Sequence, residues 1–305
     1  MTDLVAMMDS LVLLILLLLL SHLTGDFIFQ SNSIAKDKTD LNRSMRIHLL
    51  HHLFLNCVFV LPYWSVIHGL HVRTIASALS MSVVLVVLHW IIDVMKVRLT
   101  KSRWFSRDAM NEWRTPLSLG SFLVDQLLHM AAIGVVVYWY SSSQWTKSAP
   151  VFHAFLFAPH LHLPLPDRIA VWCIALILVT RVSSIIVQIL VHPLTGMNQQ
   201  LIEHRITRTT HIDNFQSEIK DQKSYAVVSA SDVSRGRQIG YLERIIIMIL
   251  IYKGAYSAIG FVVAAKSLVR FKNLDHREWA EYFLVGTLIS ILLGMLWGFL
   301  LQFAS

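Results

Sequence analysis

Three apolar segments of the chain each carry a histidine and an aspartate separated by four positions. The pairs are His22 with Asp26, His89 with Asp93, and Asp125 with His129. On a helix, a spacing of four places both side chains on one face, one turn apart. Ionisable groups are costly in a bilayer, so they usually face the interior of a helix bundle and mark a site or a pathway. Together with the neighbouring histidines His48, His51 and His52, these pairs predict a common polar pocket.

Imidazole and carboxylate groups gathered in one pocket are standard ligands of zinc and similar divalent ions. Three protein ligands and one open position make a site that activates water, and further carboxylates can orient the ligating imidazoles. The candidate metal ligands are His22, Asp26, His51, His89, Asp93, Asp125 and His129, and the candidate catalytic carboxylates among them are Asp26, Asp93 and Asp125.

The second helix offers a choice of histidines. His51 and His52 point about 100° apart on a helix, so we expect at most one of them to face the pocket. His48 is expected at the level of the lipid headgroups, and Lys96 is expected to extend its amino group to the headgroups.

Three functions fit this set of residues. The first is a membrane-embedded, metal-dependent hydrolase that acts on a lipid-linked molecule or a peptide. The second is a proton- or ion-coupled transporter, because chains of Asp and His relay protons in membranes. The third is a non-catalytic membrane component in which the pairs satisfy each other and a cytoplasmic partner is recruited through residues 193–237.

The composition indicates a polytopic membrane protein. Hydrophobic residues make up 55% of the chain and charged residues 15%, and an uninterrupted apolar run extends from Leu11 to Leu20. Several segments reach the roughly 20 residues that a spanning helix needs. We expect an all-α bundle of six to seven transmembrane helices, over 4–30, 47–69, 74–97, 116–140, 167–192, 238–266 and 281–303. Cys57 and Cys173 lie in apolar runs and indicate neither a disulfide framework nor a zinc cluster.

The chain divides into three regions. Residues 1–142 form an N-terminal four-helix membrane domain with the His/Asp motifs, residues 143–166 an external loop rich in proline and aromatics, and residues 167–305 a C-terminal membrane region with a cytoplasmic loop at 193–237. The net charge of +7 arises mainly in loops between helices. This distribution indicates contact with the bilayer and its anionic headgroups, not with nucleic acid.

Lysine and arginine alternate between rich and poor loops, which places the N-terminus outside and the first, third and fifth loops in the cytoplasm. The first four helices then carry their polar residues in the cytoplasmic leaflet. The sixth loop is also basic, although a spanning helix at 238–266 would place it outside. That segment either spans, giving seven helices, or bends back, giving six; its apolar content favours seven. Glu243 within it is expected to pair with Lys253 or Arg181.

The motifs resemble those of a bacterial membrane-protein family known as a domain of unknown function. The resemblance rests on His22-x-x-x-Asp26-Phe27-x-x-Gln30, on His89-x-x-x-Asp93-x-x-Lys96, and on Asp125-Gln126-x-x-His129. It covers about residues 20–135 and implies a location in the bacterial inner membrane, with no assigned activity. Gly25 stands at a position that varies in the family and is expected to be incidental.

Overall fold

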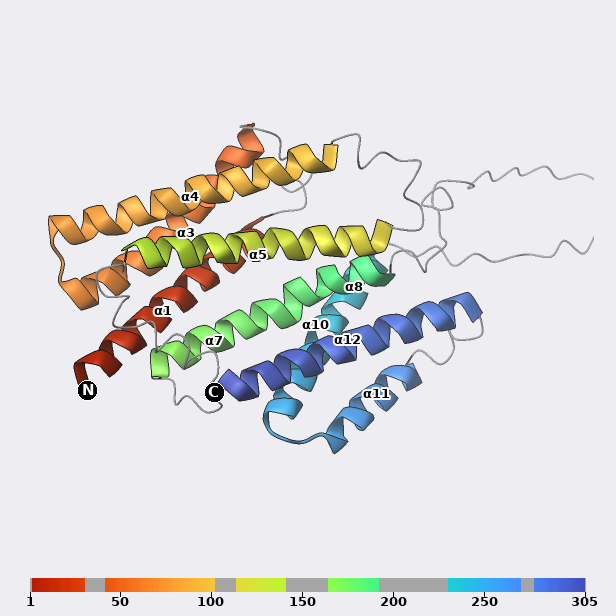
Figure 1. The fold of residues 1–305 in the computed structure, drawn as a ribbon. Coiled ribbons are helices and arrows are strands. Elements are labelled where there is room, and N and C mark those ends of the chain that lie inside the picture. Colours follow the sequence, from red (N-terminus) through yellow and green to blue (C-terminus); the bar gives the residue numbers. More distant parts are fainter. Residues whose placement is uncertain are drawn as a thin grey trace, which may run out of the picture.

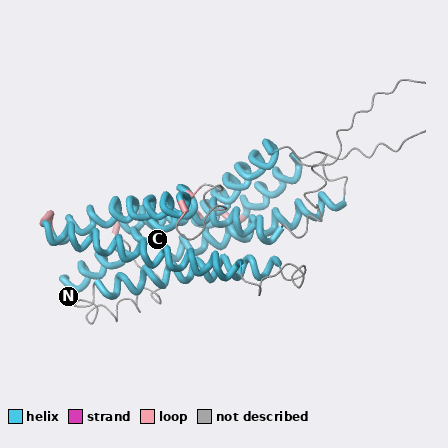
Figure 2. The backbone as a smooth tube through the Cα atoms, turned by 90° about the horizontal axis from the view of Figure 1, so that it is seen from above, coloured by secondary structure: helices cyan, strands magenta, loops and turns pink. Residues whose placement is uncertain are grey.

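The computed structural model of the protein describes residues 2–30, 42–101, 114–140, 164–191, 230–269 and 277–304. These ranges contain helices and no strand, and the helices pack side by side in an elongated bundle (Figures 1 and 2). Six helical segments are long and apolar enough to cross a membrane: Leu11–Phe29, Arg43–Ile67, Val72–Leu99, Ser118–Tyr140, Leu165–Val191 and Phe283–Phe303. The predicted all-α polytopic fold is confirmed.

The N-terminal half is built from four long helices. These are α1 (Thr2–Thr24), which continues as the π-helix η1 (Gly25–Phe29), then α3 (Arg43–His68), α4 (Val72–Lys101) and α5 (Arg114–Tyr140). Asn42 caps α3, because its Oδ1 atom accepts a hydrogen bond of 2.9 Å from the Met45 amide. Gly69 ends the helix with a φ of 76°, a conformation that favours glycine, and the chain reverses into α4. Each of α1 and α4 packs against both α3 and α5.

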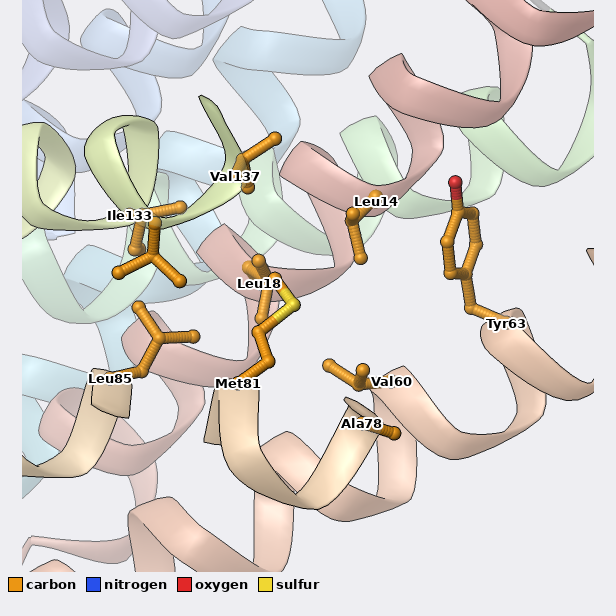
Figure 3. Close-up of a cluster of buried hydrophobic side chains, with 10 residues drawn as sticks. Leu14, Leu18, Val60, Tyr63, Ala78, Met81, Leu85, Ile133 and Val137 are labelled. Atoms are coloured by element: carbon orange, nitrogen blue, oxygen red, sulfur yellow. The ribbon is translucent and has the colours of Figure 1, made fainter. Parts of the chain in front are cut away.

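An apolar core joins these four helices (Figure 3). Its buried members are Leu14 and Leu18 of α1, Val60 and Tyr63 of α3, Ala78, Met81 and Leu85 of α4, and Ile133, Val136 and Val137 of α5. On every helix these residues lie on the side of the polar motifs that is nearer the N-terminal end of α1. The four helices are therefore sealed by apolar packing in one half, and their His/Asp residues gather in the other.

The C-terminal half packs against α1 through α7 (Leu165–Ile177), which continues without a break through the π-helix η3 (Leu178–Val182) into α8 (Ser183–Val191). It also contains α10 (Ala230–Tyr252), α11 (Ser257–Val269) and α12 (Arg277–Ala304). A Cβ atom on Gly298 would lie 2.6 Å from Cβ of Ile251, so only glycine permits this approach of α12 to α10. Gly294 and Gly298 are four residues apart, a spacing of small residues that lets membrane helices pack closely.

The segment 238–266 does not form the favoured seventh span. Helix α10 ends at Tyr252, Gly254 adopts a φ of 70°, and α11 runs back beside α10 (Figure 1). The bent alternative is therefore the observed one, and among the described residues six segments qualify as spans. The reversal also explains the basic sixth loop, because α11 ends near the end of the bundle at which α10 begins and α12 starts there. The predicted loops 143–166 and 193–237 lie largely outside the described residues, although α7 begins at Leu165 and α10 at Ala230.

Charged residues of the C-terminal half have partners that differ from the expected ones. Glu243 pairs with Lys266 across the α10–α11 turn, at 2.5 Å between Oε2 and Nζ. Neither Lys253 nor Arg181 takes this place; each lies over a tyrosine ring, Tyr252 and Tyr241 respectively. The reversal of the chain at Gly254 brings Lys266 to Glu243, a contact that a straight helix would not allow.

Candidate metal centre

Five imidazoles and three carboxylates from the first four helices converge in one cluster. They are His22 of α1, Asp26 of η1, His48 and His52 of α3, His89 and Asp93 of α4, and Asp125 and His129 of α5. Every one of the five rings contacts at least two others in stacked, tilted or edge-on geometry, with ring centroids 4.0–5.8 Å apart. The predicted convergence of polar residues in one pocket is confirmed.

Asp26 lies at the centre of the imidazole nitrogens. Its Oδ1 atom is 3.0 Å from Nε2 of His52, 3.3 Å from Nε2 of His48 and 3.7 Å from Nε2 of His89. The Nε2 atoms of His48 and His89 are themselves 3.0 Å apart. The other carboxylate oxygen of Asp26, Oδ2, is 3.7 Å from Nε2 of His22. Several imidazoles therefore direct the same ring nitrogen toward one carboxylate.

The π-helix η1 and Gly25 set the position of Asp26. A π-turn inserts one residue into a helix and is frequent at functional sites. Gly25 is buried against the His52 ring, and a Cβ atom there would lie 2.7 Å from Nε2 of His52. The expectation that Gly25 is incidental is therefore wrong: glycine is required for the imidazole of His52 to lie against the helix backbone and reach Asp26.

Helix α3 contributes His48 and His52 to the cluster and directs His51 away from it. His48 and His52 are almost fully buried, whereas the His51 ring lies beside Phe29, with ring centroids 5.6 Å apart. His51 is thus not among the grouped residues, whereas His48 is buried against the rings of His52 and His89. A sequence signal for this outcome exists, because His48 and His52 have the same spacing of four as the three pairs that led to the site.

Asp125 is held from the side of α4. The Lys96 amino group lies 2.7 Å from Oδ2 of Asp125, so Lys96 does not extend only to the headgroups as expected. Gln126 donates to the same oxygen at 3.1 Å. His129 donates from Nδ1 to the backbone carbonyl of Asp125 at 2.8 Å, when that nitrogen carries the ring proton.

The ligand atoms fall into three overlapping groups whose members lie within 4.8 Å of one another: His22, Asp26, His52 and His89; His48, His89 and Asp93; and Asp93, Asp125 and His129. Next to them is a small cavity between Leu18, His22, His52, Leu85, His89 and His129, with about 20 Å³ open to the centres of water molecules. A space of that size holds one or two waters. The site thus combines nitrogen and oxygen donors with room for a small reactant.

Comparison with known proteins identifies the N-terminal half. Residues 13–156 match a family described as a protein of unknown function (DUF3307). No curated protein and no solved structure shows a significant match to the chain. The match includes all four helices that supply the cluster, in agreement with the resemblance of the motifs. Residues 13–156, which hold every residue of the candidate metal centre, are therefore similar to the DUF3307 family.

Proposed function

We propose that the first four helices bind a divalent metal ion such as zinc and catalyse the hydrolysis of a substrate that arrives from the cytoplasmic leaflet. The substrate is a lipid-linked molecule or a peptide. The observation that carries the proposal is the arrangement of imidazole nitrogens around Asp26.

The separations between these atoms are those of metal ligands. A tetrahedral zinc ion with bonds of about 2.0–2.1 Å keeps its ligand atoms about 3.3–3.4 Å apart. The separations among Asp26 Oδ1 and the Nε2 atoms of His48, His52 and His89 include values of 3.0, 3.3 and 3.7 Å. A neutral imidazole carries only one N–H, so three rings directed at one oxygen are better satisfied by a shared cation than by mutual hydrogen bonds.

The chain's own residues suit hydrolysis. A bound divalent ion supplies Lewis acidity and makes water more acidic at neutral pH. Asp93 lies 3.4 Å from His89 Nε2 and 3.6 Å from His48 Nε2 through its Oδ2 atom, so it is within reach of an ion held by these nitrogens and can bind that ion or accept a proton from water. The apolar side chains of Leu18 and Leu85 at the adjacent cavity limit access of bulk water to the reacting groups.

A proton relay across the membrane is supported less well. A relay needs titratable groups along the whole path, yet the cluster is followed on the same four helices by the apolar core around Leu18, Val60 and Met81. That core contains no Asp, Glu, His, Lys or Arg among its described members. Apolar side chains therefore close the cluster on the side nearer the N-terminal end of α1.

The orientation of the site follows from charge. The helix ends that flank the basic loops lie toward one end of the bundle (Figure 1). On each of the first four helices the His/Asp residues are nearer to that end than the apolar core is. By the positive-inside rule this end faces the cytoplasm of a bacterial cell and contacts anionic headgroups.

Metal analysis of the purified protein tests the proposal. We expect wild-type protein in detergent to contain stoichiometric zinc or a similar ion, and the double variant with Asp26→Ala and His89→Ala to lose it. His71→Ala is the matched control, because His71 is exposed at the opposite end of the bundle and its removal should leave the metal content unchanged. Size-exclusion chromatography and circular dichroism identify the folded fraction of each variant.

The hydrolytic step is tested with membranes from cells that lack the chain, incubated in ¹⁸O-labelled water with the metal-loaded protein. A hydrolase incorporates ¹⁸O into a membrane-derived product, and the Asp26→Ala/His89→Ala variant does not. Folded wild-type protein that neither contains nor binds a divalent ion overturns the metal site. Metal-loaded protein that yields no labelled product overturns the hydrolase.

A further inference from the structure

Asp93, Asp125 and His129 form a group of their own beside the nitrogen cluster around Asp26. They come from α4 and α5, and their ligand atoms lie within 4.8 Å of one another. The three side chains are buried, with Asp125 5% and His129 3% exposed. The proposed function requires one metal ion at the first cluster and gives this second group no role.

His129 is oriented to present a lone pair. When its Nδ1 donates to the Asp125 carbonyl, at 2.8 Å, the other ring nitrogen is unprotonated. That nitrogen, Nε2, is buried and has no hydrogen-bond partner among the described residues. Metal-ligating histidines are fixed in this way, with the second ring nitrogen bonded to a carbonyl or carboxylate.

Asp125 has one occupied oxygen and one open oxygen. Oδ2 accepts from Lys96 and Gln126, whereas Oδ1 is buried without a hydrogen-bond partner among the described residues. A buried acceptor left in this state costs about 1–3 kcal/mol unless something binds it. Asp93 brings a third acceptor atom to the same group. Three acceptors exceed the two protons of a water molecule, and a cation satisfies all of them.

The second group is continuous with the first through Asp93. The Asp93 Oδ2 atom lies 3.6 Å from Nε2 of His48 and 3.4 Å from Nε2 of His89, and the same carboxylate belongs to the group with Asp125 and His129. A carboxylate shared by adjacent groups is suited to bridge two ions, which in two-metal enzymes lie about 3.5–4 Å apart.

We propose that Asp93, Asp125 and His129 bind a second divalent ion, bridged by Asp93 to the first, and that the ion pair takes a phosphate group of the substrate. The inference rests on the proposed function and narrows its substrate to a phosphate ester. Three carboxylates and the Lys96 ammonium give the site a formal charge of about −2, so two divalent ions leave it positive in a medium of low dielectric constant. A phosphate dianion offsets that excess, and two-metal sites stabilise both oxygens of an in-line displacement at phosphorus.

Zinc titration of metal-stripped full-length protein tests the second ion. We expect wild type to bind two equivalents and His129→Ala to bind one, with the tighter equivalent retained. Asp125→Asn provides a second variant whose amide oxygen still accepts from Lys96, and it too should bind one. His71→Ala, an exposed histidine with the same substitution, should bind two. Calorimetry with inorganic phosphate should show binding to the doubly loaded wild type and loss of binding in His129→Ala.

The outcomes separate this inference from the proposed function. One zinc equivalent in wild type, or two in both His129→Ala and Asp125→Asn, overturns the second ion and leaves a one-metal hydrolase possible. Two equivalents without phosphate binding, or phosphate binding that His129→Ala does not change, overturn the substrate class. Failure of wild type to bind any zinc, manganese or cobalt overturns the proposed function as well.

Discussion

Both halves of the bundle bury ionisable side chains between apolar helices, but Arg244 of the C-terminal half and the His/Asp cluster of the N-terminal half find their partners in different ways. In the C-terminal half, Arg244 donates to the carbonyl of Val179 at 2.7 Å, to the carbonyl of Thr180 at 3.2 Å and to Ser290 Oγ at 3.1 Å. In the N-terminal half, Nε2 of His22, Oδ1 of Asp125 and Nε2 of His129 are buried without a hydrogen-bond partner among the described residues. Paired groups hold helices together, whereas unpaired acceptors gathered at one point indicate a ligand.

A π-helix serves each half in a different way. In η3 the altered turn directs the carbonyls of Val179 and Thr180 to Arg244, so a side chain of the same protein donates hydrogen bonds to them. In η1 it directs the Asp26 carboxylate to the histidines of other helices. The same backbone device therefore produces a structural contact in one half and a candidate binding site in the other.

The largest expected effect comes from breaking the internal pairing of the C-terminal half. Arg244→Leu removes the hydrogen bonds from a buried guanidinium to the carbonyls of Val179 and Thr180 and to Ser290 Oγ, and a hydrogen bond to a charged group contributes about 1.5–3 kcal/mol. We expect a loss of stability on the order of 3 kcal/mol, measured as a lower midpoint of thermal unfolding in detergent, since the hydrogen bonds of a buried charged donor are lost. The metal content of the folded fraction should not change, because Arg244 belongs to the other half.

Arg181→Leu is the matched control for that change. Arg181 is exposed and lies 5.7 Å from the centre of the Tyr241 ring, so its removal should lower stability less. Equal unfolding midpoints for the two variants would show that the hydrogen bonds of Arg244 do not hold the C-terminal half together.

The second effect separates two adjacent histidines. His52→Ala removes a ring whose Nε2 lies 3.0 Å from Asp26, so we expect metal affinity to fall at least about tenfold, the lower bound for losing a group that supports a metal site. His51→Ala removes a ring that contacts Phe29 and should leave the affinity unchanged. Competition with a chromogenic chelator measures both variants. A larger loss of metal affinity in His51→Ala than in His52→Ala would show that the metal binds at the face of α3 that carries His51, against the proposal.

The sequence predicts convergence better than it predicts contacts. Helix directions and a spacing of four are sufficient to bring His22, His89 and His129 into one half of the bundle, because both follow from helix geometry and loop charge. The rotation of α3 about its axis depends on packing, so only the structure could show that His52, and not His51, faces the cluster.

Partners on different helices were also beyond sequence reasoning. Lys96 reaches Asp125 on α5, and Lys266 reaches Glu243 after a reversal of the chain. Long side chains have many rotamers, and their partners are fixed only when neighbouring helices are placed. The long apolar helices were predictable because their length and hydropathy depend on local composition alone.

The smallest expected effect tests whether η1 positions the site or only ends a helix. Gly25→Ala places a Cβ atom 2.7 Å from Nε2 of His52, so the imidazole must rotate away. A displaced ring is less harmful than an absent one, and we expect metal affinity to fall, but by no more than in His52→Ala. Gly134→Ala on α5 is the control, because a Cβ atom there meets nothing within 4 Å and the change should leave the affinity unaltered.

A double variant decides whether Gly25 acts through His52. Residues in contact are not additive, so once His52 is alanine, Gly25→Ala has no ring to displace and should cause no further loss of metal affinity. If the effects of Gly25→Ala and His52→Ala instead add, Gly25 acts on the backbone of η1, and the π-helix itself positions Asp26 independently of the histidine packed against it. Either result assigns the position of Asp26 to residues of the N-terminal half. The π-helix of the C-terminal half, whose carbonyls bind Arg244, has no counterpart of them.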